Sequence, residues 1–236
     1  MNAAIITAAG KGTRLKGDIS KQFMEIYGKP ILAHTITAFQ NASKIKEIYI
    51  SVSKDYLELC QKSIIEKYSF DKVKKLVIGG STRQESVYNA LVELPASTRL
   101  VSIHDGVRPL ITAEEIDSLI NTLIKENKKN PKIRGVIMAA PARETIKITD
   151  NGTIDMTVPR DTVWYAQTPQ IFFYKDILEA HNKARKDNFI GTDDACLVER
   201  INRKVSVVRG RHENIKITTP TDLFLAELIM TRNVKR

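Results

Sequence analysis

The chain has few of the residues that stabilise small secreted domains. It contains two cysteines, Cys60 and Cys196, among 236 residues. Neither lies in a Cys-x-x-Cys pair or near a cluster of histidines, so the sequence indicates neither a disulfide framework nor a zinc site. We expect both to be buried thiols in a reducing, cytoplasmic environment.

Long hydrophobic runs are also missing. No apolar stretch approaches the roughly 18–20 residues that a transmembrane helix needs. The N-terminus shows no basic segment followed by an apolar region, so we expect neither a signal peptide nor a membrane partner.

Aromatic residues make up only 6% of the chain, whereas lysine and arginine give it a net charge of +10. Such a charge favours nucleic acid, an acidic membrane surface or phosphorylated small molecules as partners. A nucleic-acid-binding protein would concentrate its basic residues in a stripe with aromatics among them. Here they are spread along the chain, so we expect no nucleic-acid partner and much of the excess to be solvated lysine on helix faces.

Apolar, β-branched runs recur along the chain. Several are continuous rather than alternating, which is typical of strands buried on both faces of a parallel sheet. The segments between them have helical patterns, so the sequence predicts an α/β fold with a mostly parallel sheet. The expected strands are Ala3–Thr7, Ile45–Val52, Val73–Ile78, Leu100–Ile103, Gly135–Ala139 and Val205–Val208.

Capping signals predict where several helices begin. Ser81 and Thr112 each open a capping-box pattern. Pro30 is expected in the first turn of a helix. Thr219 is expected as an N-cap, with Pro220 as the first helical residue.

Residues 144–158 show a different pattern. Two alternating runs, 144–149 and 153–158, flank Asn151-Gly152, and Asn-Gly between such runs is a strong hairpin signal. Because a two-stranded ribbon alone is only marginally stable in water, we expect this hairpin to pack on something else, such as another subunit.

The first expected strand leads directly into AAGKGTR at residues 8–14. Glycine allows the backbone to approach a ligand closely, and consecutive amides form a concavity that binds anions. Arg14, and Lys21 further on, could then neutralise charge during phosphoryl chemistry. The glycine spacing fits neither the usual P-loop nor the dinucleotide fingerprint, so a plain tight turn is the alternative.

Other polar residues follow expected strands, where ligands bind in such sheets. Asp105 could bind a sugar hydroxyl or a metal, and Arg108 could anchor it or contact a phosphate; the alternative is an ion pair in a turn. Gly80 and Ser86 could present an amide and a hydroxyl to a nucleobase.

The sequence allows two interpretations of Lys216, whereas Thr192 and His104 are each expected to have a structural role. Lys216 lies in an expected strand over 214–218 and points either to solvent or into a cleft. Thr192 is expected as the N-cap of an apolar helix. His104 is expected to be a packed residue at a strand end rather than a catalytic base.

Taken together and in order, these motifs resemble the 2-C-methyl-D-erythritol 4-phosphate cytidylyltransferases of the non-mevalonate isoprenoid pathway. The resemblance covers residues 3 to about 227. It is carried by AAGKGTRL with KQF, GGSTRQESV, IHDGVRP, APARETIK, TVPRDTVWYAQTPQIF, TDDACLVE and GRHENIKITTPTDL.

The resemblance implies a single three-layer nucleotidyltransferase (Rossmann-like) domain over residues 1–236. Residues 142–163 would form a projecting β-arm that builds a homodimer. In the implied reaction, an oxygen of the substrate phosphate attacks the α-phosphorus of CTP in line, pyrophosphate leaves, and Mg²⁺ assists.

The resemblance also implies three groups of site residues. The cations that would stabilise the transition state are Arg14, Lys21 and Lys216. The nucleotide would be held by Ala8, Ala9, Gly10, Gly12, Gly80, Ser86, Asp105 and Thr168, with Asp105 also a possible metal ligand. The sugar phosphate would be held by Thr145, Arg160, Thr192 and Arg108, the first two from the neighbouring subunit's arm.

The chain departs from the family pattern beside one of these residues, where Pro159 replaces an acidic residue before Arg160. A cytidylyltransferase acting on a pentitol phosphate such as ribitol 5-phosphate is therefore the alternative function.

Overall fold

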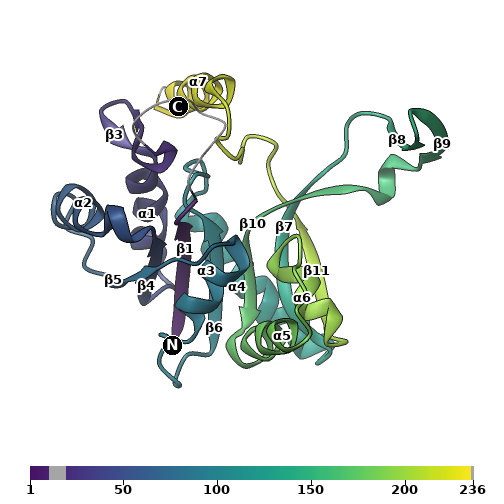
Figure 1. Cartoon of the computed structure of the whole chain (residues 1–236), viewed down its shortest axis with the longest axis horizontal. Helices are drawn as coiled ribbons and strands as arrows, with labels where there is room; N and C mark the ends of the chain where they lie inside the picture. Colours follow the sequence, from purple (N-terminus) through teal and green to yellow (C-terminus); the bar gives the residue numbers. More distant parts are fainter. Residues whose placement is uncertain (11–19, 235–236) are drawn as a thin grey trace.

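The computed structural model describes residues 1–10 and 20–234, and a seven-stranded sheet forms its centre (Figure 1). The antiparallel strand β10 (Trp164–Phe173) separates two parallel groups. The sheet confirms the predicted α/β fold. Its order is β11 (Lys204–Arg209), β7 (Ile133–Pro141), β10, β6 (Leu100–Asp105), β1 (Asn2–Ala8), β4 (Glu47–Val52) and β5 (Val73–Ile78).

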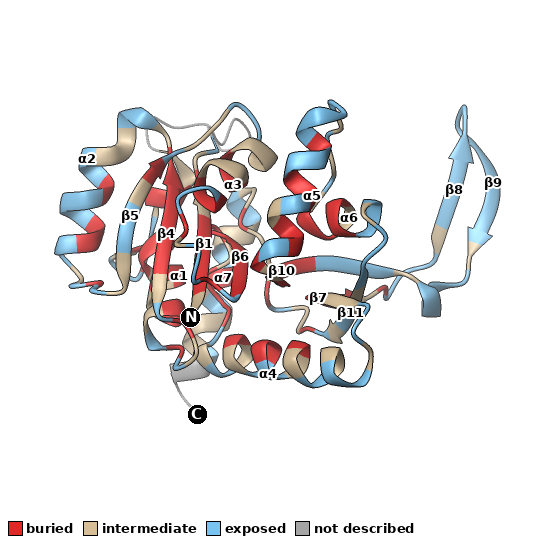
Figure 2. Ribbon diagram, turned by 90° about the horizontal axis from the view of Figure 1, so that it is seen from below, coloured by how far each residue is buried: buried red, intermediate tan, exposed pale blue. Residues whose placement is uncertain are grey.

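Helices cover both faces of this sheet (Figure 2). One face packs against α1 (Ile31–Asn41), α4 (Ala113–Lys129) and the segment formed by α2 (Leu57–Cys60) and the π-helical η3 (Gln61–Glu66). The other packs against α3 (Arg83–Leu91), α5 (Tyr174–Lys186) and α6 (Asp194–Arg200).

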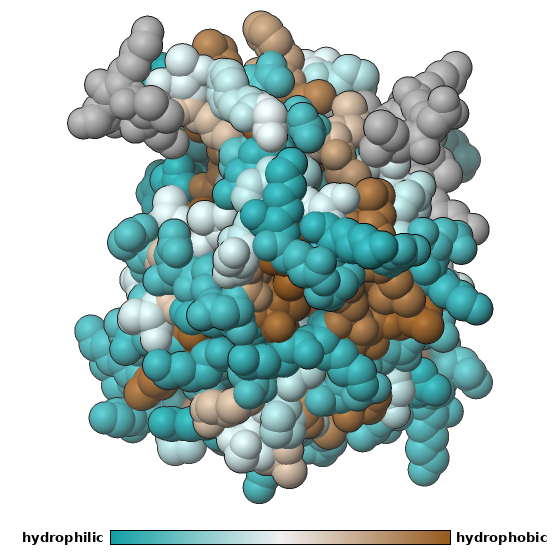
Figure 3. Space-filling model, turned by 90° about the vertical axis from the view of Figure 1, so that its left-hand side faces the viewer, coloured by the Kyte–Doolittle hydropathy of each residue, from teal (hydrophilic) through white to brown (hydrophobic). Residues whose placement is uncertain are grey.

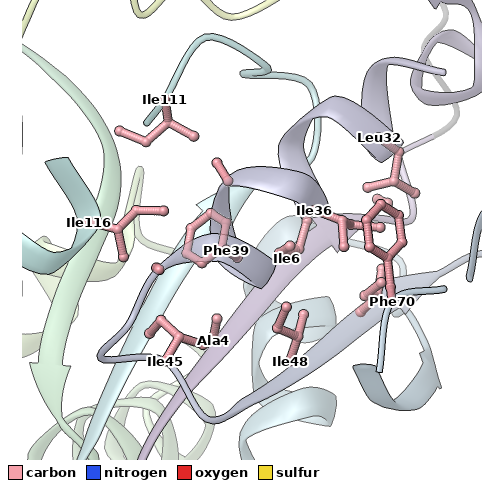
Figure 4. Packing of buried hydrophobic residues seen from close by; sticks show 14 of the residues in the cluster. Ala4, Ile6, Leu32, Ile36, Phe39, Ile45, Ile48, Phe70, Ile111 and Ile116 are labelled. Carbon is pink, nitrogen blue, oxygen red and sulfur yellow. The ribbon is translucent and has the colours of Figure 1, made fainter. Parts of the chain in front are cut away.

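The sequence of β1 is apolar at successive positions because both faces of this strand pack against helices. Side chains alternate between the two faces of a strand. Ala4 and Ile6 join the cluster under α1 and α4, and Ile6 lies among the side chains shown in Figure 4. Ala3 and Ile5 join the cluster under α3 and α5. Both faces are therefore buried, as the continuous run predicts.

A smaller layer packs near the carboxyl ends of the strands. It contains η1 (Lys21–Phe23), the hairpin of β2 (Glu25–Ile26) and β3 (Lys29–Pro30), and α7 (Pro220–Val234). Ile26, Ile31 and Ala226 are fully buried together in its apolar cluster. A 3₁₀ turn, η2 (Lys54–Tyr56), follows β4.

The predicted hairpin is present as a projecting arm. Strands β8 (Ile146–Asp150) and β9 (Thr153–Val158) pair in antiparallel fashion, and η4 (Arg160–Thr162) leads back to β10. Asn151 and Gly152 both have positive φ, 45° and 82°, as a two-residue hairpin turn requires. The arm extends away from the sheet and is exposed along most of its length (Figures 1 and 2).

The edge strand β5 has exposed Lys74 and Lys75. Lysine on an edge strand opposes pairing with a further strand from another chain. Figure 3 shows the side of the molecule on which β5 lies, and hydrophilic residues cover most of it.

The predictions at Pro30, Ser81 and residues 214–218 need correction. Pro30 lies one residue before α1 as its N-cap, because its backbone is extended (ψ 141°) and belongs to β3. Thr82 rather than Ser81 caps α3, since the Thr82 side chain accepts the Glu85 N–H. Residues 214–218 form no strand; side-chain hydrogen bonds from Asn214 and Arg108 hold this segment instead.

Other expectations hold. Thr112 forms a full capping box with Glu115. The Thr219 hydroxyl accepts the Asp222 N–H as α7 begins at Pro220. Within the described residues, no helix has both the length and the apolar character needed to cross a membrane.

Candidate active site

Two adjoining cavities lie at the carboxyl ends of the central strands. The larger, of about 490 Å³, is bounded by the ends of β1 and β6 and by the loop after β5. The smaller, of about 210 Å³, is bounded by the irregular part of β10 and the start of α6. Both cavities share Arg83, Asp105 and Lys216, so a single group of charges lies where they meet.

The larger cavity collects most of the predicted nucleotide and catalytic residues. The predicted residues that line it are Ala8, Ala9, Gly10, Lys21, Gly80, Ser86, Asp105 and Lys216. A Cβ placed on Gly10 would meet nothing within 4 Å, so the backbone there faces open space. Gly12 and Arg14 lie outside the described residues.

The smaller cavity collects a second predicted group. Arg108, Thr168 and Thr192 line it. The register of β10 against β7 shifts between Ala166 and Gln170, and such irregularities redirect side chains. Thr192 does not cap α6 as predicted, because Asp193 takes that position and accepts the Cys196 N–H at 2.9 Å.

Asp105 is the centre of the charged group. Its Oδ1 accepts a hydrogen bond from Arg83 Nε at 3.0 Å. Its Oδ2 lies 3.3 Å from Arg108 Nε and 3.0 Å from Lys216 Nζ. Burial opposes ionisation, but the three cations outweigh it and hold the pKa of Asp105 far below its usual value. The carboxylate is therefore charged and fixes three cations at the cavity wall.

Lys21 reaches the larger cavity because η1 is attached to the end of β1. The buried Gln22 side chain donates a hydrogen bond from Nε2 to the Ala8 carbonyl oxygen at 2.9 Å. Lys21 directly precedes Gln22 and lines the cavity. Gln22 was not among the predicted site residues, although its motif KQF was part of the resemblance.

The Gly80 loop is held by side chains of α3. The Gly80 N–H donates to Ser86 Oγ at 3.0 Å, and Ser86 Oγ donates to the Thr82 carbonyl at 2.9 Å. The Ser81 N–H and hydroxyl both donate to Glu85 Oε2. Ser86 thus shapes the loop from within while it lines the cavity.

His104 and Thr168 form a buried pair behind Asp105. His104 Nε2 donates to the Arg108 carbonyl at 3.1 Å, so Nδ1 accepts from the Thr168 hydroxyl at 3.0 Å. Thr168 Oγ1 in turn accepts the Asp105 N–H at 3.0 Å. Burial lowers the pKa of His104 to about 4, so its ring is neutral at pH 7. These contacts agree with the packed role expected for His104.

Arg83 is a central site residue that the sequence analysis missed. It begins α3 and bridges Asp105 to the buried Asp194, whose Oδ2 lies 2.7 Å from Arg83 Nη1. Although burial alone would lower it, the pKa of Arg83 is raised by Asp194 and Asp105. Its place in the motif GGSTRQESV was the available signal, but both partners are distant in sequence.

The two predicted arm residues lie elsewhere. Thr145 and Arg160 are exposed on the arm and line neither cavity of their own chain. An Arg160 nitrogen, Nη1, donates to the Arg143 carbonyl at 3.3 Å. No group of three or more His, Cys, Asp or Glu side chains in the described part of the chain is arranged to hold a metal ion.

Chemically, the site offers two adjoining cavities with the cations Arg83 and Lys216 shared between them, an arrangement that favours anionic ligands. The profile of the family described as 2-C-methyl-D-erythritol 4-phosphate cytidylyltransferase matches residues 2–232. The chain belongs to this family.

Individual cytidylyltransferases agree with the family match. The chain is 42% identical to the 2-C-methyl-D-erythritol 4-phosphate cytidylyltransferase of Geotalea uraniireducens over 229 residues, 96% of this chain and 95% of the relative. It is also 42% identical to the one of Clostridioides difficile, over 98% of this chain and 94% of the relative.

Solved structures of cytidylyltransferases share the fold. The 4-diphosphocytidyl-2C-methyl-D-erythritol synthase of Anaerococcus prevotii has a TM-score of 0.84 at 36% identity, with 98% of this chain and 96% of that chain covered. The cytidylyltransferase of Francisella tularensis has a TM-score of 0.78 at 32% identity, with 96% and 98% covered.

Proposed function

We propose that this chain transfers CMP from CTP to 2-C-methyl-D-erythritol 4-phosphate in the two adjoining cavities, giving 4-diphosphocytidyl-2-C-methyl-D-erythritol and pyrophosphate. The observation that carries this proposal is that Arg83, Asp105 and Lys216 border both cavities in a chain of this family. Each substrate has a compartment of its own, and the reacting phosphates meet beside the same cations.

CTP occupies the larger cavity in this proposal. The backbone at Ala8, Ala9 and Gly10 supports the triphosphate, and the Gly80–Ser86 loop faces the base. Lys21 lies beside the leaving phosphates, and Arg14, outside the described residues, follows the same loop. Amides and cations arranged in advance around a phosphate stabilise the charge that develops in the transition state.

The acceptor phosphate occupies the smaller cavity, lined by Arg108, Thr168 and Thr192. One of its oxygens attacks the α-phosphorus of CTP in line. A new phosphorus–oxygen bond forms while the bond to the β-phosphate bridging oxygen breaks, and pyrophosphate carries away the electron pair. Lys216, at the junction of the cavities, stabilises the charge on the five-coordinate phosphorus.

This mechanism needs no general base. The attacking phosphate oxygen is already ionised at neutral pH. His104, which directly precedes Asp105, is fully buried, and its two ring nitrogens bond to the Arg108 carbonyl and the Thr168 hydroxyl. Rate enhancement thus comes from positioning and charge stabilisation.

In our proposal the described residues hold no resident divalent cation, and the triphosphate of CTP would supply the ligands for one. Asp105 is the acidic residue in the described lining of the larger cavity, and both of its oxygens already pair with protein cations. Such a carboxylate does not fit a resident metal site. Mg²⁺ is commonly held through substrate phosphates, so the nucleotide supplies the oxygens that it prefers.

The arm, we propose, forms a homodimer and brings Thr145 and Arg160 to the partner's acceptor site. It exposes apolar side chains, with Ile148 47%, Ile154 59% and Met156 47% exposed. A projecting ribbon with exposed apolar residues is marginal by itself and gains stability by packing on a partner.

We place the protein in the cytoplasm, which is supported by two free thiols, Cys60 and Cys196.

The family match favours methylerythritol phosphate over ribitol 5-phosphate as acceptor.

Labelled CTP tests the type of reaction. With CTP, Mg²⁺ and methylerythritol phosphate, α-labelled phosphate should move to the organic product and γ-labelled phosphate to pyrophosphate. Transfer of the γ-label to the acceptor would show a kinase and contradict the proposal. A reaction without acceptor is the control for CTP hydrolysis.

A further inference from the structure

An acidic side chain behind the cavity wall takes no part in the mechanism above. Asp194 is 1% exposed. Its Oδ2 accepts from Arg83 Nη1 at 2.7 Å, and its Oδ1 accepts from Nε2 of the fully buried His181 at 3.3 Å. The described lining of the two cavities does not include Asp194.

Helix capping does not account for this carboxylate. The Asp193 side chain caps α6 by accepting the Cys196 N–H. Gln170 Oε1 accepts the N–H groups of Asp194 and Ala195 at 3.2 and 3.1 Å. The first N–H groups of α6 are thus satisfied by other side chains, and the carboxylate of Asp194 is directed at Arg83 and His181.

Arg83 joins this carboxylate to the cavity. Its guanidinium donates from Nε to Asp105 and from Nη1 to Asp194, and the side chain is 29% exposed. Asp105 also holds Lys216 and Arg108. With Asp194, the charged group contains two carboxylates, Asp105 and Asp194, for three cations. Without Asp194, Asp105 alone would neutralise Arg83, Arg108 and Lys216.

We propose that Asp194 is a positioning residue for cytidylyl transfer: it takes part of the Arg83 charge and leaves Asp105 to hold Lys216 and Arg108 at the cavity wall. His181 supplies the second hydrogen bond that fixes Asp194. This inference rests on the proposed function, because Lys216 is the cation whose position it concerns.

The substitution Asp194→Asn tests the proposal, since it keeps the shape of the side chain and removes its charge. Asp105 must then neutralise the charge of Arg83 alone, and it no longer holds Lys216 in a fixed position. We expect kcat to fall on the order of 10²-fold, as misplacement of a catalytic group does, with little change in the KM for CTP.

Asp176→Asn is the matched control. Asp176 is also buried and also bridges two arginines, at 2.6 Å from Arg134 and 3.1 Å from Arg203. It lies on α5 and is not part of the described cavity walls. We expect this variant to lose stability but to keep kcat. Equal losses of kcat in the two variants would overturn the proposal.

A double variant separates positioning from general destabilisation. If Asp194 acts through Arg83, adding Asp194→Asn to Arg83→Gln should cost no further activity, because residues acting as a unit are not additive. It also removes both partners of the Arg83–Asp194 ion pair together, so we expect it to fold more readily than either single variant. A further loss of tenfold or more would overturn the proposal, even if Asp194→Asn alone failed to fold.

Wild-type protein in the same assay separates this inference from the proposed function. Absence of wild-type turnover with CTP and methylerythritol phosphate would contradict the function itself. Normal wild-type turnover with an unimpaired Asp194→Asn variant would contradict only the positioning role.

Discussion

The ammonium of Lys216 lies 3.0 Å from the carboxylate of Asp105, where the two cavities meet. The lysine comes from the irregular segment before α7, and the aspartate ends β6. Asp105 is 6% exposed, whereas Lys216 is 39% exposed. The pair therefore has a buried anchor and an accessible cation, as a group that meets a charged substrate requires.

Asp105→Asn should weaken both the fold and the reaction. It leaves Arg83, Arg108 and Lys216 without their shared anion, and loss of one partner from a buried ion pair costs about 3–5 kcal/mol. We expect a fall of this order in the free energy of unfolding, measured in urea, and a lower kcat.

Asp187→Asn is the control for the Asp105 variant, because Asp187 pairs with Arg200 at the surface, away from both cavities. Unchanged stability in Asp105→Asn would contradict the central role given to this carboxylate.

Lys21→Ala should lose roughly 10²–10³-fold in kcat, the usual cost of removing one group that stabilises transition-state charge. Steady-state pyrophosphate release measures this loss. Lys75→Ala is the control, since Lys75 pairs with Glu93 on the edge strand β5. Near-normal turnover of Lys21→Ala would remove Lys21 from the mechanism.

Acidification should destabilise the protein through His104. Its pKa is about 4 in the fold, against about 6.5 when unfolded, so below pH 6.5 the unfolded chain takes up a proton that the folded chain does not. The resulting loss grows from pH 6.5 down to 4 and reaches about 3 kcal/mol.

Urea unfolding across this pH range measures the effect. His104→Gln should show a smaller loss than wild type over the same range, although it is less stable at pH 7. His212→Gln is the control for replacing a histidine. Identical pH dependence in wild type and His104→Gln would refute the assignment to His104.

The arm should complete the partner's site. Arg160→Ala and Lys216→Ala are each expected to be nearly inactive as pure proteins. In a heterodimer of the two, one site would combine the intact Lys216 of one chain with the intact Arg160 of the other.

Co-expression should therefore restore about a quarter of wild-type activity, since half of randomly paired dimers are mixed and each has one intact site. Sedimentation of the mixture checks that dimers form. If activity stayed at the level of the single variants despite dimer formation, Arg160 would not act across the interface.

Features governed by neighbouring residues were predictable from the sequence. Continuous apolar runs identified strands buried on both faces, as in β1, and Asn151-Gly152 identified the turn of the arm. Helix starts were predicted to within one residue at Pro30 and Ser81. Pro30 takes the capping position itself because its own backbone is extended, and Thr82, with a better-placed hydroxyl, caps α3 in place of Ser81.

Features governed by tertiary contacts were not predictable from the sequence. Arg83 joins Asp105 to Asp194 only because α3, β6 and α6 meet at one edge of the sheet. Residues 214–218 alternate like a strand, but side-chain hydrogen bonds hold them as a connecting segment. The alternation nevertheless left open that Lys216 points into a cleft, and it does line both cavities.

Acceptor preference tests the central claim most directly. Pyrophosphate release would be followed with CTP and Mg²⁺ and with either methylerythritol 4-phosphate or ribitol 5-phosphate. We predict a much higher kcat/KM for methylerythritol phosphate, which would also show that Pro159 beside Arg160 is tolerated. A higher kcat/KM for ribitol phosphate would contradict the proposed function while leaving the fold and the cation group intact.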